Sequence, residues 1–409
     1  MKLLHTADLH LGKVIHEHSL IEDQRNMLQT LLAALKDHSF NALVIAGDVY
    51  DRSIPQPDAV KLLGPFLGQL KKECPAVEVF LISGNHDSAS RLGFGRELFA
   101  ELGVHVGTEP EDACKPVVVT VGQEKTAFFM LPFLAAGSLK SVLTSEDGQE
   151  PAPLRSQSLL AREAAARLEK ARREAIENGA DNTALIAHLF ASGGVSSQSE
   201  RTFLGNAELI DIHLFSGFDY IAMGHLHTFQ KVGEKAFYSG SPLAYSFSEA
   251  ARGKVFLAVT LEKGKAPRVE PIPVTPLRKM TRLKGDFASF LRGDMTDESN
   301  AAAQASAADY LEITLTDTAL IENPLSLLSR RFPYLLRIDQ SAAINTRLRE
   351  RTAVLKTAYA AHTHTMEKNG EDIVDDFSAF LGEMYGAKEA YAEELALFKD
   401  ILLETEAEP

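Results

Sequence analysis

Short apolar runs alternate with longer stretches of mixed polarity over residues 1–270. A short apolar run bounded by turn residues predicts a strand buried in a sheet. Six such runs predict strands at 2–6, 42–46, 77–82, 126–131, 184–187 and 220–223, and two later runs, 236–239 and 254–261, predict hairpin or edge strands. Residues 19–38 and 154–178 carry apolar side chains at helical spacing and predict amphipathic helices. The alternation is typical of a layered α/β domain.

The pattern changes after residue 270. Prolines at 267, 271, 273 and 276 mark a domain boundary near 270–276. Beyond it, runs at 310–315, 320–332 and 334–338 predict strand, helix and strand, which together indicate a small α+β capping domain at 277–345. Residues 366–409 carry apolar side chains at helical spacing in acidic surroundings. They predict C-terminal amphipathic helices that pack either on their own domain or on a partner.

The composition indicates the class of protein, and the sequence shows where its charged residues lie. Of the 409 residues, 45% are hydrophobic, which excludes a mainly disordered chain. The formal net charge is −14, but residues 367–409 alone carry −10, so the acidity belongs to the tail and does not exclude a nucleic-acid partner. No apolar run reaches the roughly 18 residues of a membrane span. Cys74 and Cys114 form no disulfide framework, and we expect a cytoplasmic protein.

One constellation of residues carries chemistry. Five apolar runs each end in side chains that bind metal ions: Asp8-Leu9-His10, Gly47-Asp48, Gly84-Asn85-His86, His188 and Gly224-His225-Leu226-His227. Because ligands of open α/β sheets bind beyond the carboxyl ends of the strands, we expect these ends to converge on one site. We expect the glycines at 47, 84 and 224 to let the backbone turn sharply, so that the next side chain points inward.

The residue types favour a pair of divalent cations. Two adjacent ions can clamp a phosphate and activate a water for in-line attack. We expect Asp48 to bridge the ions, because it lies centrally between two half-sets in chain order. The expected first set is Asp8, His10, Asp48 and His227, and the expected second set is Asp48, Asn85, His188 and His225. Mixed imidazole and oxygen ligands suit manganese, iron or zinc better than magnesium or calcium.

Three neighbouring residues have further interpretations. His86 follows a ligand directly, and we expect it to protonate the leaving oxygen, with a phosphate-orienting role as the alternative. Asp51 either orients His86 or a metal-bound water, or makes only a loop hydrogen bond. We expect Asp87 to cap the following helix.

The five elements resemble the calcineurin-like metallophosphoesterase superfamily, whose fold is a four-layer β-sandwich flanked by helices. More narrowly, LLHTADLHLG, GDVYDRSIP, SGNHDSASRL, SSQSERTFLGN, GHLHTFQKV and YSGSPLAYSFSEA resemble the SbcD family of bacterial nuclease subunits. These motifs span residues 1–250, while the cap and the tail match that family in size and position only.

The resemblance implies DNA as substrate, manganese as the working metal, and hydrolysis of phosphodiesters. Relatives act as 3′→5′ exonucleases on duplex ends and as endonucleases on single strands and hairpins. It implies a coiled-coil ATPase of the SbcC type as partner, bound through the C-terminal helices, and a homodimer within a heterotetramer. Some archaeal and eukaryotic members carry a histidine where this chain has Asp51. The role of that histidine in positioning DNA therefore cannot be transferred to this chain. Candidate DNA contacts are Arg52, Arg91, Arg96 and Arg201.

Two other functions fit parts of the pattern. The same metal core could serve a phosphatase or phosphodiesterase that acts on small molecules or phosphoproteins, although such an enzyme needs neither cap nor partner helices. A non-enzymatic scaffold could use metal for stability alone, although His86 and a site with an excess of positive charge argue against it. Degradation of duplex DNA that depends on manganese separates the nuclease from both.

Overall fold

The computed structural model describes residues 1–140, 153–194, 209–292, 308–344, 370–385, 391–392 and 394–399. The chain divides into two compact units. The larger unit consists of Met1–Asp317 and Ile321–Gln340, and the smaller of Thr318–Leu320 and Ser341–Pro409.

Two six-stranded sheets form the main part of the larger unit. The first has the order β14 (Arg268–Pro273), β13 (Val255–Thr260), β1 (Lys2–Thr6), β4 (Ala42–Ile45), β5 (Glu78–Ile82) and β6 (Val104–Gly107). The second has the order β11 (Gln230–Val232), β12 (Ala236–Tyr238), β10 (Tyr220–Gly224), β9 (Asn182–His188), β8 (Glu124–Leu131) and β7 (Val117–Val121). All eight predicted strands are therefore confirmed.

The two later strands do not lie at sheet edges. β13 pairs with β14 on one side and β1 on the other, and β12 lies between β11 and β10. Of the two predicted alternatives, the hairpin is the one confirmed, since β13–β14 and β11–β12 are antiparallel pairs. β14 is the edge strand, and it contains Pro271 and Pro273, which cannot donate to a further strand. The first sheet therefore continues to Pro273.

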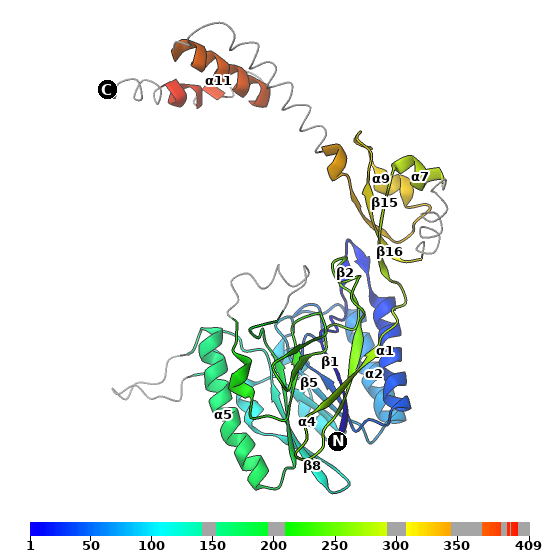
Figure 1. Ribbon diagram of the computed structural model, residues 1–409, viewed down its shortest axis with the longest axis vertical. Helices are drawn as coiled ribbons and strands as arrows, with labels where there is room; N and C mark the ends of the chain where they lie inside the picture. Colours follow the sequence, from blue (N-terminus) through cyan, green and yellow to red (C-terminus); the bar gives the residue numbers. More distant parts are fainter. Residues whose placement is uncertain are drawn as a thin grey trace, which may run out of the picture. The chain divides into compact units, whose positions relative to one another are not determined.

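The two sheets pack face to face between α5 (Gln157–Glu177) on one side and α1 (Ile21–Asp37) and α2 (Pro57–Glu73) on the other (Figure 1). Side chains such as Val44, Phe80, Phe128 and Ile186 alternate along the strands into a core between the sheets. The opposite face of the first sheet packs against α1 and α2, and that of the second packs against α5. The predicted helices at 19–38 and 154–178 are confirmed. The result is a helix–sheet–sheet–helix sandwich of four layers.

The central strands run parallel within each sheet. β1, β4, β5 and β6 form parallel pairs, as do β8, β9, β10 and β12. Parallel strands place all their carboxyl ends at the same edge of the sheet. The loops that follow β1, β4, β5, β9 and β10 therefore come together, and these loops carry the predicted ligands.

A three-stranded parallel sheet follows the sandwich: β15 (Met280–Gly285), β16 (Tyr310–Leu315) and β17 (Leu335–Asp339). It packs against α7 (Phe287–Arg292) and α9 (Pro324–Leu328), which confirms the predicted strand, helix and strand and adds β15. Arg278, just before β15, pairs with Asp23 of α1 at 3.1 Å, and the Tyr310 hydroxyl donates to the same carboxylate. These contacts join the sheet to the sandwich.

The smaller unit contains α11 (Gly370–Tyr385) and a helical stretch at 394–399. Leu381, Tyr391 and Leu395 form its buried cluster, and the rings of Phe377 and Phe398 stack with centroids 4.0 Å apart. The predicted C-terminal helices therefore pack on one another through part of their apolar surface.

Candidate metal centre

The predicted ligands lie on loops that bind one another through main-chain hydrogen bonds. Asp8 N donates to Gly47 O at 3.0 Å, and His10 N donates to Asp48 O at 2.9 Å, so the loops after β1 and β4 run together. His225 N, after β10 of the second sheet, donates to both carboxylate oxygens of Asp8, at 2.9 and 3.1 Å. The two sheets therefore meet at this edge.

The first half-set gathers as predicted. Ligand atoms of Asp8, His10 and His227 lie within 4.8 Å of one another. All three residues are buried, and the Nε2 atoms of His10 and His227 lie 3.1 Å apart. Two imidazole nitrogens and a carboxylate thus face a common point.

The second half-set gathers beside it. Asn85 Oδ1 lies 3.1 Å from His188 Nε2 and 2.9 Å from His225 Nδ1. His188 Nδ1 donates to Ala46 O at 2.8 Å, so the Nε2 atom of the neutral ring is an acceptor. It faces Asn85 Oδ1, which is an acceptor too. Two facing acceptors need a proton or a cation between them, and this donor set fits a divalent metal ion.

Asp48 lies between the two half-sets. Its Oδ2 atom is 3.7 Å from His10 Nε2 and 3.5 Å from His188 Nε2. The other oxygen, Oδ1, accepts a hydrogen bond from His86 N at 2.9 Å, which fixes the carboxylate plane. A single carboxylate oxygen therefore faces one histidine from each half-set.

The electrostatics of the centre show that protons occupy it when no cation does. Burial raises the pKa of Asp8 to about 7. Burial lowers the pKa of His188, but the Asp48 carboxylate outweighs this effect and raises it to about 9. Burial also lowers the pKa of His225, to about 3, so this ring is neutral and can bind a metal ion. At neutral pH a cation entering the centre displaces protons.

The ligand loops have unusual backbone geometry. Asp8, His10, Asp48 and His225 all have positive φ values, of 54°, 42°, 49° and 104°. Each such residue costs on the order of 1 kcal/mol or more, a strain that is typical of functional sites. The loops adopt this geometry because it turns successive side chains toward the centre.

The glycines serve two different purposes. Gly47 has a φ of +89°, as expected for a sharp turn. Gly84 and Gly224 have no such φ. A Cβ at Gly84 would lie 2.1 Å from Asp48 Oδ1, and one at Gly224 would lie 1.9 Å from Ala46 O. Both positions need glycine because the loops pack too closely for any side chain.

His86 lies beside the first half-set. Ligand atoms of His10, Asp48 and His86 lie within 4.8 Å of one another. His86 Nδ1 donates to the main-chain carbonyl of Asp51 at 2.9 Å, which fixes the orientation of the ring. Residue 51 thus orients His86 through its main chain. The Asp51 carboxylate instead pairs with Lys13 at 2.7 Å and lies 3.6 Å from His10 Nδ1.

Asp87 does not cap the following helix, contrary to expectation. Helix α3 (Ala89–Leu92) begins after Ser88 and has no side-chain cap. The Asp87 carboxylate accepts hydrogen bonds from the main-chain N–H groups of Val49, Tyr50 and Gly84, at 2.9 to 3.0 Å. It therefore ties the loop after β5 to the loop after β4.

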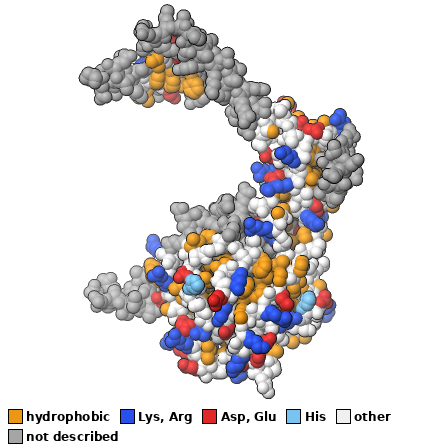
Figure 2. All heavy atoms as spheres, in the orientation of Figure 1, with side chains coloured by type: hydrophobic (Ala, Val, Ile, Leu, Met, Phe, Trp, Pro, Cys, Tyr) orange, Lys and Arg blue, Asp and Glu red, His pale blue; other side chains and the backbone are white. Residues whose placement is uncertain are grey.

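The candidate DNA contacts differ in their surroundings. Arg52 and Arg91 are exposed, on the loop after Asp51 and on α3. Arg96 pairs with Glu97 and Asp112, both at 3.1 Å, and is less available. Arg201 lies outside the described residues. On the face drawn in Figure 2, basic and acidic side chains are interspersed, without a large patch of one sign.

Several buried polar residues around the centre were not predicted. Gln24 of α1 donates to His10 O at 2.7 Å and accepts from Gly12 N at 2.8 Å. Tyr245 donates to Leu9 O, and Glu249 lies behind His227. The signal for Tyr245 and Glu249 was the motif that follows the last ligand, SPLAYSFSEA, which contains both but does not by itself indicate a metal site.

Known proteins match this chain over most of its length. The family model of calcineurin-like phosphoesterases matches residues 1–229. The D subunit of the nuclease SbcCD from Staphylococcus epidermidis is 30% identical over 341 residues, which are 83% of this chain and 85% of that protein. Its namesake from Staphylococcus saprophyticus is 30% identical over 349 residues, 85% and 86% of the two chains. The solved structure of TT1561 of Thermus thermophilus covers 67% of this chain and 99% of its own, at 11% identity and a TM-score of 0.37.

The matched family model covers more than half of the chain, and both phosphoesterase sheets contribute to the centre just described. The chain belongs to the calcineurin-like phosphoesterase family and, within it, to the SbcD proteins. It is a metal-dependent phosphodiesterase, and the family and fold expected from the motifs are confirmed.

Proposed function

We propose that the protein is the nuclease subunit of an SbcCD-type complex and hydrolyses DNA phosphodiesters with two manganese ions. It acts as a 3′→5′ exonuclease on duplex ends and as an endonuclease on single strands and hairpins. The observation that carries the proposal is the position of Asp48 Oδ2, between a histidine of each half-set. The names of the two Staphylococcus relatives support the nuclease activity and the complex.

We assign the residues to the two ions in the division that the sequence suggests. The first ion would be held by Asp8, His10, Asp48 and His227, and the second by Asp48, Asn85, His188 and His225. Imidazole nitrogens outnumber carboxylates in this set, which favours a transition metal such as manganese over magnesium or calcium. Only Asp8 and Asp48 are acidic, so two divalent cations would leave an excess of positive charge to attract a phosphodiester.

The side chains perform the remaining steps. Bound ions would neutralise the phosphate and supply the nucleophile from water. His86 donates a proton from Nε2 to the oxygen that leaves, while Asp51 O holds its Nδ1–H. The Asp51 carboxylate, paired with Lys13, stabilises the loop that presents this carbonyl. Arg52 and Arg91 contact the DNA backbone.

The substrate class is tested by comparing the rates of hydrolysis of different substrates. We expect the purified chain with its ATPase partner to degrade blunt duplex DNA when Mn²⁺ is supplied, and to stop when a chelator removes the metal. Phosphopeptides and free nucleotides serve as the comparison at equal concentration. Rapid hydrolysis of either, with DNA left intact, would identify a phosphatase or small-molecule phosphodiesterase instead, and inactivity on all of them would favour a scaffold.

The C-terminal unit is the proposed docking site for a coiled-coil ATPase of the SbcC type, within a heterotetramer built on a homodimer. The proposed domains are the nuclease domain at 1–270, which β14 extends to Pro273, the cap at 277–345 and the partner-binding helices at 366–409. The internal packing of the helices leaves Ile373, Phe380 and Leu397 exposed, at 38%, 52% and 63%. Apolar side chains exposed on a small helical unit are typical of a surface that binds another helix.

Deletion of residues 370–409 is expected to abolish ATPase binding and to spare weak metal-dependent hydrolysis. A sharper variant is Phe380→Glu, which places a charge on the exposed apolar surface and should weaken binding about 10-fold or more. Ala379→Glu adds the same charge at the preceding residue of the same helix, which is also exposed, and serves as the control. Binding is measured by calorimetry, and unchanged affinity after the deletion would place the docking surface elsewhere.

The prediction of a cytoplasmic protein rests on the two cysteines. Cys74 and Cys114 are both free cysteines. Separately, no helix among the described residues combines the length and the apolar character of a membrane span.

A further inference from the structure

Glu249 is a buried carboxylate that lies directly behind His227. Its side chain is fully buried, and its Oε1 atom is 3.5 Å from His227 Nδ1. The other ring nitrogen, Nε2, lies 3.1 Å from His10 Nε2 in the first half-set. The carboxylate therefore faces the nitrogen of His227 that points away from the metal centre.

Lys254 holds this carboxylate in place. Its Nζ donates to Glu249 Oε2 at 2.6 Å, to the main-chain carbonyl of His227 at 2.8 Å and to Ser241 Oγ at 2.9 Å. Tyr245 N also donates to Glu249 Oε2, at 3.3 Å. The ion pair thus contacts His227 twice, through Glu249 at the ring and through Lys254 at the main chain.

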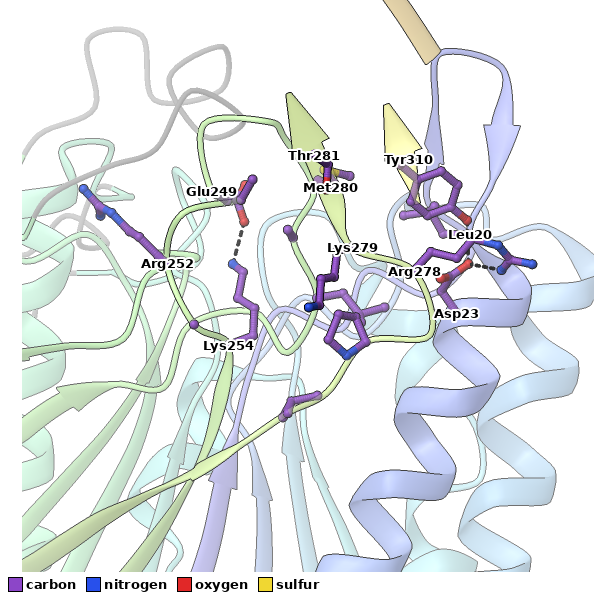
Figure 3. A pocket seen from close by; sticks show the side chains of 16 residues that line it. Leu20, Asp23, Glu249, Arg252, Lys254, Arg278, Lys279, Met280, Thr281 and Tyr310 are labelled. Carbon is purple, nitrogen blue, oxygen red and sulfur yellow. Dashed lines mark hydrogen bonds and ion pairs between the residues drawn. The ribbon is translucent and has the colours of Figure 1, made fainter. Parts of the chain in front are cut away.

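The pair also lines a cavity of about 350 Å³. Figure 3 shows Glu249 and Lys254 joined across one side of this cavity, with Arg278 and Tyr310 near its opposite side. Lys254 is only 9% exposed at its side chain, so little solvent screens the pair. The pair therefore acts on His227 with little screening by water.

A buried ion pair contributes little to stability compared with apolar side chains of similar volume, because desolvation of the two charges offsets their attraction. The contacts on His227 give this pair a different purpose. An outer carboxylate that accepts a hydrogen bond from the ring N–H of a metal-binding histidine fixes the tautomer and the ring orientation, and it increases the ligand's basicity.

We propose that Glu249 is a positioning residue for His227, which it holds with the proton on Nδ1 and the Nε2 lone pair toward the first ion, and that Lys254 orients the Glu249 carboxylate. The inference rests on the proposed role of His227 as a ligand. Loss of such an outer partner commonly weakens metal binding about 10- to 100-fold.

The test replaces the pair without leaving an unpaired buried charge. Glu249→Met/Lys254→Met makes the site apolar, while Glu249→Gln/Lys254→Met keeps an acceptor for the Nδ1 proton. Mn²⁺ binding to metal-free, full-length protein is measured by calorimetry, and thermal unfolding is followed in parallel. The matched control is Arg282→Met/Glu312→Met, which removes another ion pair, in the three-stranded sheet.

We expect the Met/Met variant to unfold near the wild-type temperature and to bind one of two Mn²⁺ ions about 10- to 100-fold more weakly. The Gln/Met variant should recover most of this loss, and the control should bind both ions as the wild type does. Wild-type affinity at both sites in the Met/Met variant would overturn the inference. Wild-type protein that binds fewer than two Mn²⁺ ions would instead contradict the proposed function.

A second measurement needs no variant. The ¹⁵N chemical shifts of the His227 ring in metal-free wild-type protein report which nitrogen carries the proton. A proton on Nδ1 supports the inference. A proton on Nε2 alone would overturn it even if the Met/Met variant failed to fold.

Discussion

Replacement of Asp48 by asparagine is expected to eliminate both tight metal binding and hydrolysis. The asparagine side chain has almost the same shape as aspartate, but it lacks the charge that faces His10 and His188 together. Both ions should therefore bind more weakly, by more than the roughly 10- to 100-fold that loss of an outer partner costs. Metal content after dialysis and the rate of DNA hydrolysis at fixed Mn²⁺ are the measurements.

The control for this variant is Asp58→Asn. Asp58 is an exposed aspartate in the first turn of α2, paired with Lys61 at the surface, so its loss should change neither metal content nor rate. Two ions still bound at full occupancy in the Asp48→Asn protein would contradict the bridging role of Asp48.

Replacement of His86 by glutamine is expected to leave metal content nearly intact and to reduce turnover about 100-fold or more. Glutamine can keep the hydrogen bond to Asp51 O, but it has no proton to give to a leaving oxygen. Turnover of DNA and bound Mn²⁺ are measured on the same preparation. His38→Gln, at the exposed residue after α1, is the matched control.

The choice of leaving group separates proton donation from phosphate orientation. A phosphodiester with a nitrophenyl leaving group needs no proton, so the His86→Gln protein should hydrolyse it at close to the wild-type rate. An equal loss on DNA and on the nitrophenyl ester would favour the alternative in which His86 only orients phosphate. Unchanged turnover of DNA would remove His86 from the mechanism.

The strands and long helices were predictable because each has a strong local signal. Strands buried on both faces, such as β4 and β5, appear as short unbroken apolar runs, and α1 and α5 carry clear apolar stripes. The division of the strands between two sheets was not predictable from such runs. It depends on the pairing of β13 with β1, which are separated by most of the chain.

The convergence of the candidate ligand side chains was predictable because metal-binding residue types follow several of the strand ends. The supporting residues were not, because their roles depend on tertiary contacts. Asp87 binds main-chain N–H groups of a different loop, and Glu249 and Lys254 contact His227 only after the chain folds back. The tight packing at Gly84 and Gly224 is likewise a contact with a distant segment, which no local pattern reveals.

The most direct test of the metal centre is anomalous scattering from crystals soaked in Mn²⁺. We expect two peaks at the edge where the two sheets meet, both within bonding distance of the carboxylate at position 48. Imidazoles of 10 and 227 should surround one peak, and those of 188 and 225 the other. A single peak, or two peaks that do not share that aspartate, would contradict the account.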